Sequence, residues 1–119
     1  MVVKKIEDLL KHFEKKEFSP VYLLTGEEDY YIDLLVSKFE EEVLDESERD
    51  FNMATLYGLE TNAKEICSFA KQYPIISKNR LIIVKEFQQI DKKELSPLSF
   101  YIEKPLSSTI LVLVNKNKT

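Results

Sequence analysis

The run Leu81-Ile82-Ile83-Val84 is apolar at every position, and residues Thr109 to Val114 further along the chain are nearly so. A strand with one face in water alternates apolar and polar residues, whereas an unbroken apolar run indicates burial of both faces. Such strands are typical of a parallel sheet that is covered by helices on both sides. These two runs therefore predict the centre of an α/β sheet.

Two weaker strand segments and four helical segments surround these runs. Val21–Thr25 follows Pro20 and ends at Gly26, and residues 51–57 end at Gly58. Apolar residues recur at helical spacing before and between the strands, over residues 6–13, 32–43, 63–70 and 98–102. Alternation of strand and helix predicts a three-layer, doubly wound α/β domain with a mostly parallel sheet.

Helix ends are signalled at two places in the second half of the chain. Asn62 with Glu65 three residues later forms a capping pair, and Ser96 before Pro97 predicts a cap followed by a first-turn proline. Pro105 cannot continue that last helix, so we expect the helix to end before it.

Composition describes one globular domain without an extended basic surface. The chain has 119 residues, of which 44% are hydrophobic and 32% charged, with a formal net charge of −4. No signal peptide or membrane-length apolar run is present, and a single cysteine, Cys67, fits a reducing cytoplasm. The polar residues 115–119 follow the last apolar run abruptly, so we expect residues 1–119 to be a fragment of a longer protein.

The loop after the first strand is where an α/β sheet of this kind would bind a phosphate. A P-loop has the pattern G-x-x-x-x-G-K-[ST], but counting from Gly26 places Tyr31, Ile32 and Asp33 where the second glycine, the lysine and the hydroxyl belong. Glu27, Glu28 and Asp29 also put three carboxylates at the helix N-terminus, where they would repel a triphosphate. The sequence therefore predicts a degenerate phosphate loop, Gly26-Glu27-Glu28-Asp29, and no nucleotide cofactor.

The residues that other kinds of enzyme require are also missing from the sequence. A phosphoreceiver domain needs an aspartate after the third strand, but Lys85, Glu86 and Phe87 stand there. The sequence has no Cys/His metal spacing and no nucleophile elbow, so no catalytic or metal residues are predicted. We expect the single histidine, His12, to be a solvated surface residue and Cys67 to be a buried, unreactive thiol.

Four segments in order resemble the delta-subunit family of the bacterial DNA polymerase III clamp loader. They are residues 20–30, the helix carrying Ala63, Ile66 and Ala70, residues 73–84, and Tyr101–Pro105 with the strand that follows. The pattern of proline, two apolar residues, Ser77, Arg80 and an apolar strand is the most specific of these. The resemblance covers the chain from about residue 18 to its end.

This resemblance implies the first domain of a clamp-loader subunit, of the P-loop NTPase or AAA+ type but without a functional P-loop. It implies that a small helical lid domain and a C-terminal collar domain are absent from residues 1–119, and that the collar joins the other clamp-loader subunits. Contact with DNA is expected only in the assembled complex, and no membrane is involved. Because another strand follows the fourth in AAA+ sheets, we also expect the strand Ile110–Val114 to lie close to an exposed edge.

In this family the delta subunit binds and opens the ring-shaped sliding clamp, the beta subunit, for loading onto primed DNA, with no catalysis of its own. Two apolar side chains before the third strand enter a pocket of the clamp, and they match Ile75 and Ile76, with Tyr73 and Pro74 beside them. Family members often carry an aromatic at the second position, where this chain has Ile76. Residues alone leave open whether the two isoleucines turn outward or into the core; with the resemblance we expect at least one to be exposed.

Three basic residues flank the third strand: Lys78, Arg80 and Lys85. They could touch DNA, but solvated or fold-supporting charges are the favoured interpretation, and we expect Arg80 to pair with an acid near the strand start. The alternative function is a different non-catalytic α/β interaction domain with a degenerate nucleotide site. An ATPase or a receiver enzyme is the third hypothesis.

Overall fold

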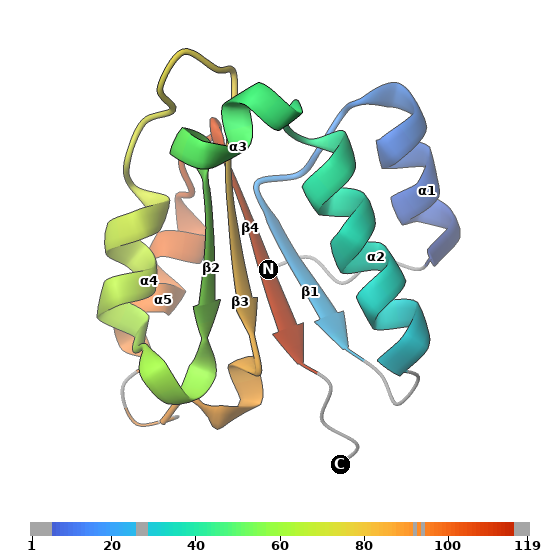
Figure 1. Ribbon diagram of the computed structural model, residues 1–119. Helices are drawn as coiled ribbons and strands as arrows, with labels where there is room; N and C mark the ends of the chain where they lie inside the picture. The colour runs from blue at the N-terminus through green and yellow to red at the C-terminus, as the bar shows by residue number, and fades with distance from the viewer. Residues whose placement is uncertain (1–5, 26–28, 92, 94, 116–119) are drawn as a thin grey trace.

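A computed structural model describes residues 6–25, 29–91, 93 and 95–115 of the chain. Its centre is one sheet of four parallel strands in the order β1-β4-β3-β2 (Figure 1). The strands are β1 (Val21–Thr25), β2 (Met53–Tyr57), β3 (Arg80–Lys85) and β4 (Thr109–Asn115). The predicted α/β class with a parallel sheet is therefore confirmed.

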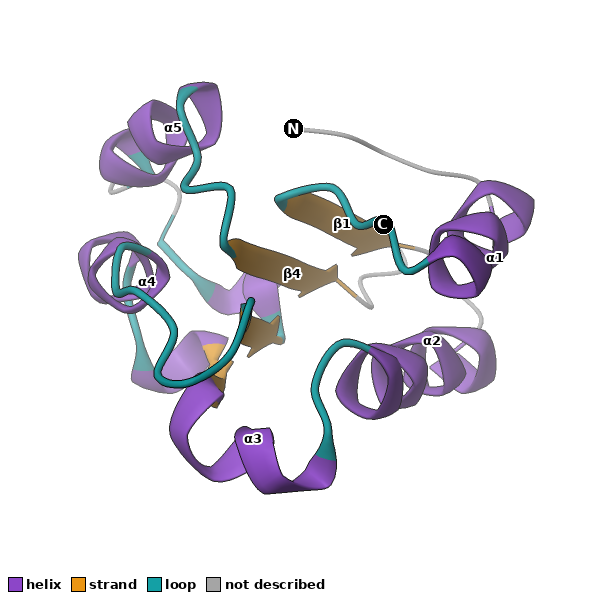
Figure 2. Ribbon diagram, turned by 90° about the horizontal axis from the view of Figure 1, so that it is seen from above, coloured by secondary structure: helices purple, strands orange, loops and turns teal. Residues whose placement is uncertain are grey.

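Helices cover both faces of this sheet and make three layers. The helices are α1 (Ile6–Lys15), α2 (Asp29–Glu42), α3 (Glu46–Asn52), α4 (Ala63–Ala70) and α5 (Ser96–Glu103). Seen along the sheet from above, α1 and α2 lie on one side and α4 and α5 on the other (Figure 2). The short helix α3 crosses the end of the sheet at which the strands begin (Figure 1).

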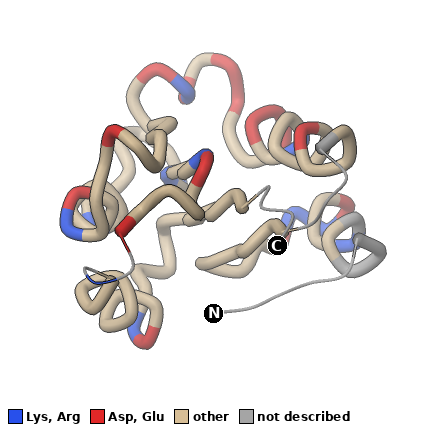
Figure 3. Tube along the Cα trace, turned by 90° about the horizontal axis from the view of Figure 1, so that it is seen from below, with Lys and Arg blue, Asp and Glu red and all other residues tan. Residues whose placement is uncertain are grey.

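The central strands supply both halves of the core, as their sequence predicts. On β3, Leu81 and Ile83 pack with α1 and α2, whereas Ile82 and Val84 pack with α4 on the opposite face. Successive side chains of a strand point to opposite faces, so a strand buried on both sides must be apolar throughout. Most charged residues lie instead on the helices and connections, as the coloured trace shows (Figure 3), and those of β3, Arg80 and Lys85, stand at its two ends.

The strand Ile110–Val114 is buried, and the expectation that it lies near an exposed edge is wrong. It belongs to β4, which pairs with β1 on one side and with β3 on the other. Its five residues are at most 2% exposed. The order of strands along the chain differs from their order in the sheet, because the last described strand, β4, lies between β1 and β3. Among the described strands, the edges of the sheet are β1 and β2.

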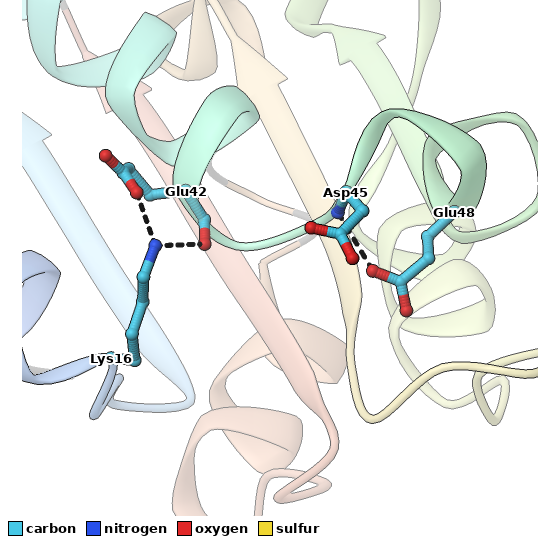
Figure 4. Close-up of polar contacts among 4 residues, drawn as sticks. All are labelled: Lys16, Glu42, Asp45 and Glu48. Atoms are coloured by element: carbon cyan, nitrogen blue, oxygen red, sulfur yellow. Dashed lines mark hydrogen bonds and ion pairs between the residues drawn. The ribbon is translucent and has the colours of Figure 1, made fainter.

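The second strand begins later than its sequence predicts. Residues 51 and 52 end helix α3, and β2 starts at Met53. The sequence of α3 has no apolar stripe, which explains why periodicity does not reveal it. Its N-terminus is capped instead, because the Asp45 backbone N–H donates to Glu48 Oε1 at 2.9 Å (Figure 4).

The other predicted helix ends are partly confirmed. Asn62 caps α4 as expected, because its side-chain oxygen accepts the Glu65 N–H at 2.9 Å. Ser96 is not a cap: it is the first residue of α5, Leu95 occupies the cap position, and Pro97 lies in the first turn. Pro97 thus marks the start of the helix correctly, but one residue further into it than predicted.

Helix α1 ends at a left-handed residue, Lys16, whose φ is 56°. The Glu17 N–H donates to His12 O at 3.2 Å and the Lys16 N–H to Phe13 O at 3.4 Å, which is the Schellman pattern of a helix C-terminus. The Lys16 ammonium contacts the Glu42 carboxylate and donates to the Glu42 backbone oxygen at 3.1 Å (Figure 4). This exposed contact joins the C-terminal ends of α1 and α2.

His12 is half-buried, which corrects the expectation of a solvated surface residue. Its Nδ1 lies 2.6 Å from the hydroxyl oxygen of Tyr22, and the Ser19 backbone N–H donates to the same oxygen at 2.7 Å. Burial raises the pKa of the Tyr22 hydroxyl above its usual value. Cys67 is buried, as predicted, and desolvation raises the pKa of its thiol.

Gly58 should be intolerant of any side chain. A Cβ built on it would lie 1.9 Å from the backbone oxygen of Glu86, which begins the turn after β3. We expect Gly58→Ala to lower the free energy of unfolding by about 2 kcal/mol or more, because backbone must move to admit the methyl group. Urea unfolding measures this, with the exposed neighbour Leu59 changed to alanine as the control. Equal midpoints for the two variants would contradict the prediction.

Candidate functional site: an apolar tip beside helix α3

The two sites predicted from sequence lie at opposite ends of the sheet. The strands are parallel, so the loop after β1 is at their carboxyl ends and the connection before β3 is at their amino ends. Gly26, Glu27 and Glu28 of the phosphate loop lie outside the described residues, and α2 begins at Asp29. The described part of the candidate site is therefore the connection between α4 and β3.

This connection carries an apolar tip, which we define as Tyr73, Pro74, Ile75 and Ile76. Tyr73 is 72% exposed, Ile75 is 52% exposed and Ile76 is 96% exposed. The expected exposure of at least one isoleucine is confirmed, and the alternative that both belong to the core is wrong. Exposed apolar side chains are unusual at a connection of this kind, where polar turn residues are expected, so the tip is a candidate contact surface.

The backbone of the tip adopts a costly conformation. Ile76 has a φ of 50°, in the left-handed region that β-branched residues seldom occupy. A conformation of this kind costs on the order of 1–3 kcal/mol and persists only where neighbouring structure holds it. The strain therefore falls on the residue of the tip whose side chain is the most exposed.

Helix α3 holds the tip through Asn52, a residue that the sequence analysis did not identify. The Asn52 side chain accepts the Ile75 N–H at 2.6 Å and donates to Ile75 O at 2.8 Å. It also donates to Glu48 O at 3.1 Å within its own helix. With 1% of its surface exposed, Asn52 is one of the few buried polar residues in the described part of the chain. Nothing in the local sequence indicates a contact with a residue 23 positions away.

Hydrogen bonds also order the start of α3 and the residues that follow the tip. A hydrogen bond from the Asp45 backbone N–H holds the pKa of the Glu48 carboxyl below its usual value. Ser77 directly follows the tip and accepts the Asn79 N–H at 3.3 Å. Within the described residues, the hydrogen bonds that join the tip itself to α3 are therefore those between Asn52 and Ile75.

The three basic residues near β3 have different environments. Lys78 is exposed, Lys85 is half-buried, and Arg80 is only 5% exposed. The Arg80 guanidinium donates to the backbone oxygen of Phe51 at 3.4 Å, and burial lowers its pKa. The expectation that Arg80 pairs with an acid is wrong within the described residues, because its partner is the C-terminal turn of α3. Arg80 supports the fold, and it is not an open DNA contact.

A hollow of about 450 Å³ lies beside the tip, between the connection that follows α4 and helix α5. Tyr73 of the tip forms part of its wall together with the exposed Phe100 of α5. Lys71 and Lys104 add positive charge to the same wall. The apolar surface of the tip therefore continues onto the face of α5.

No group of three or more His, Cys, Asp or Glu side chains that could hold a metal ion occurs among the described residues. No helix within the described ranges is long and apolar enough to cross a membrane. What this region presents is an exposed apolar surface.

Comparison with known proteins supplies the family. The model of the family described as DNA polymerase III, delta subunit, matches residues 22–119. The chain belongs to the DNA polymerase III delta-subunit family. It is 32% identical over 115 residues to DNA polymerase III subunit delta of Bacillus subtilis, an alignment that covers 90% of the chain and 33% of that relative.

Solved structures place the fold in the AAA+ type. The DNA clamp loader delta protein of Bacillus subtilis superposes with a TM-score of 0.86 at 30% identity, over 97% of this chain and 36% of that one. A DNA polymerase III gamma subunit-related protein of Thermotoga maritima gives 0.71 at 16% identity, over 91% and 39%, which supports the fold alone. The chain spans about a third of the length of its delta-family relatives.

Variants of Ile76 distinguish the effect of its backbone strain on stability from the effect of its exposed side chain. We expect Ile76→Gly to be about 1 kcal/mol more stable than Ile76→Ala, because glycine occupies the left-handed region freely and alanine does not. Ile76→Ala should itself change stability little, since the isoleucine side chain is almost fully in water. Thermal unfolding of the two variants measures the difference, and an alanine variant at least as stable as the glycine variant would contradict it.

Proposed function

We propose that this domain binds the sliding clamp of DNA replication through the apolar tip and helps to open the ring for loading onto primed DNA. The observation that carries the proposal is the exposure of Ile75 and Ile76 in a delta-family chain at the position where the family carries an apolar pair. A small, rigid apolar anchor that enters a pocket is what an interface hot spot requires.

Ring opening would follow from differential affinity alone. A closed ring opens when its partner binds the open form more tightly than the closed form. The domain would therefore need no chemistry of its own, and we propose that it is a non-catalytic subunit. The degenerate phosphate loop supports this, because its carboxylates occupy the position at which an ATPase holds its nucleotide.

The rest of the assembly is proposed from the family. A helical lid domain and a C-terminal collar domain would follow residue 119 in the full protein, and the collar would join the other clamp-loader subunits. ATP bound by those subunits would control access to the tip. DNA would be contacted only in the assembled complex, and the protein would act in the cytoplasm.

The tip can be tested by direct titration with the purified sliding clamp. We expect Ile75→Ala with Ile76→Ala to weaken clamp binding by roughly 3 kcal/mol or more, because the variant lacks both side chains that fill the pocket. The fold should remain intact, since both residues are exposed. Leu59→Ala is the matched control, because Leu59 is 73% exposed but follows β2 at the opposite end of the sheet.

Two results of this titration would count against the proposal. Unchanged affinity in the double variant would show that the tip is not the binding surface. Equal loss of binding in Leu59→Ala would show that any apolar surface serves, which a specific pocket does not allow.

Nucleotide binding gives an independent test of the non-catalytic assignment. We expect no saturable binding of ATP with Mg²⁺ to the isolated protein, because Glu27, Glu28 and Asp29 would repel the triphosphate. Isothermal titration with and without Mg²⁺ measures this. Stoichiometric uptake of ATP by the protein would contradict the assignment.

A further inference from the structure

We propose that Asn52 is a positioning residue for clamp binding: it fixes the tip in its binding conformation before the clamp arrives. This inference deepens the proposed function and rests on it. It starts from the environment of Asn52, which is the last residue of α3 and is 1% exposed. Its only side-chain partner outside α3 among the described residues is the backbone of Ile75, in the middle of the tip.

The geometry of this contact restrains the backbone conformation of Ile75. One amide side chain binds both the N–H and the C=O of the same residue, at 2.6 Å and 2.8 Å. The second N–H of the amide donates to Glu48 O at 3.1 Å, which fixes the side chain to its own helix. Because both partners of Asn52 are backbone groups, the contact leaves the Ile75 side chain free to face solvent.

The neighbouring strain explains why such a contact is needed. Ile76 holds a φ of 50° while its side chain stands 96% exposed, so no core packing of that side chain stabilises the conformation. The hydrogen bonds of Asn52 to Ile75, one residue earlier, attach the loop to α3 and oppose its relaxation. Without them we expect Ile76 to return to an ordinary backbone conformation and its side chain to change direction.

The consequence for binding is one of preorganisation. A loop that must be ordered on contact with a partner binds more weakly than one that is ordered beforehand, even if every contact in the complex is the same. In Figure 1, α3 lies next to the connection between α4 and β3 and spans the same end of the sheet. We infer that α3 acts as a support for the tip and that Asn52 is the point of attachment.

The test is a double-mutant cycle in the full-length protein, with affinity for the purified sliding clamp as the readout. Asn52→Ala should weaken clamp binding by about tenfold, since ordering of the loop is then deferred to the complex. In an Ile76→Ala background the same change should cost less than threefold, because the side chain that Asn52 positions is no longer present. A purely structural role would give the same loss in both backgrounds, and that result would overturn the inference.

Two further variants distinguish hydrogen bonding from packing. Asn52→Leu keeps the branching of the side chain at Cγ without its polar atoms. Asn52→Asp retains the acceptor for the Ile75 N–H but loses both donors. We expect both to bind the clamp as weakly as Asn52→Ala. Full affinity in Asn52→Leu would show that Asn52 contributes only volume and would overturn the inference.

A measurement on the unaltered protein keeps the inference testable even if the variants do not fold. The Ile75 amide should exchange with solvent at least tenfold more slowly than the amide of Lys78, which has no hydrogen-bond partner in the described part of the chain. Equal exchange of the two amides would contradict a fixed tip. If Ile75→Ala with Ile76→Ala binds the clamp normally, the proposed function fails, whereas loss of binding there with no effect of Asn52→Ala defeats this inference alone.

Discussion

The structure depends on the burial of β3 and β4 on both of their faces. Each strand sends alternate apolar side chains to the α1–α2 layer and to the α4–α5 layer, so the two halves of the core share the same backbone. The pairing of β4 between β1 and β3 then fixes where every connection leaves the sheet. With this frame in place, the connection before β3 has to cross the amino-terminal end of the sheet, where α3 lies.

Much of this frame could be predicted from sequence, because burial leaves a direct record in composition. The unbroken apolar runs indicate strands that are buried on both sides. The start of α4 is predicted by its capping residue, Asn62. Helix α3 could not be found in the same way: its seven residues are almost all polar, and it is stabilised by its cap and by contacts distant in sequence. The order of strands also escaped local patterns, since the position of β4 is a property of the whole sheet.

In the candidate site too, some residues could be predicted from sequence and others could not. Tyr73-Pro74-Ile75-Ile76 could be singled out because four apolar residues stand where a polar turn is expected, and their exposure follows. The residues that hold them could not be identified, because Asn52 and Arg80 act through backbone atoms of segments 23 and 29 positions away. His12 was misjudged for a similar reason: its partner is a hydroxyl on the first strand. Polar contacts across the fold leave no periodic signal.

The attachment of the tip to α3 also has a consequence for the order of folding. Asn52 directly precedes β2 and Ile75 lies before β3, so we expect their contact to form together with the pairing of these two parallel strands. Parallel pairing requires closure of a long chain segment and is a late, cooperative event. In a chain whose strands are unpaired or out of register, we therefore expect Ile75 and Ile76 to lie on a loop without a fixed conformation. The conformation of the tip in this way reflects the integrity of the sheet behind it.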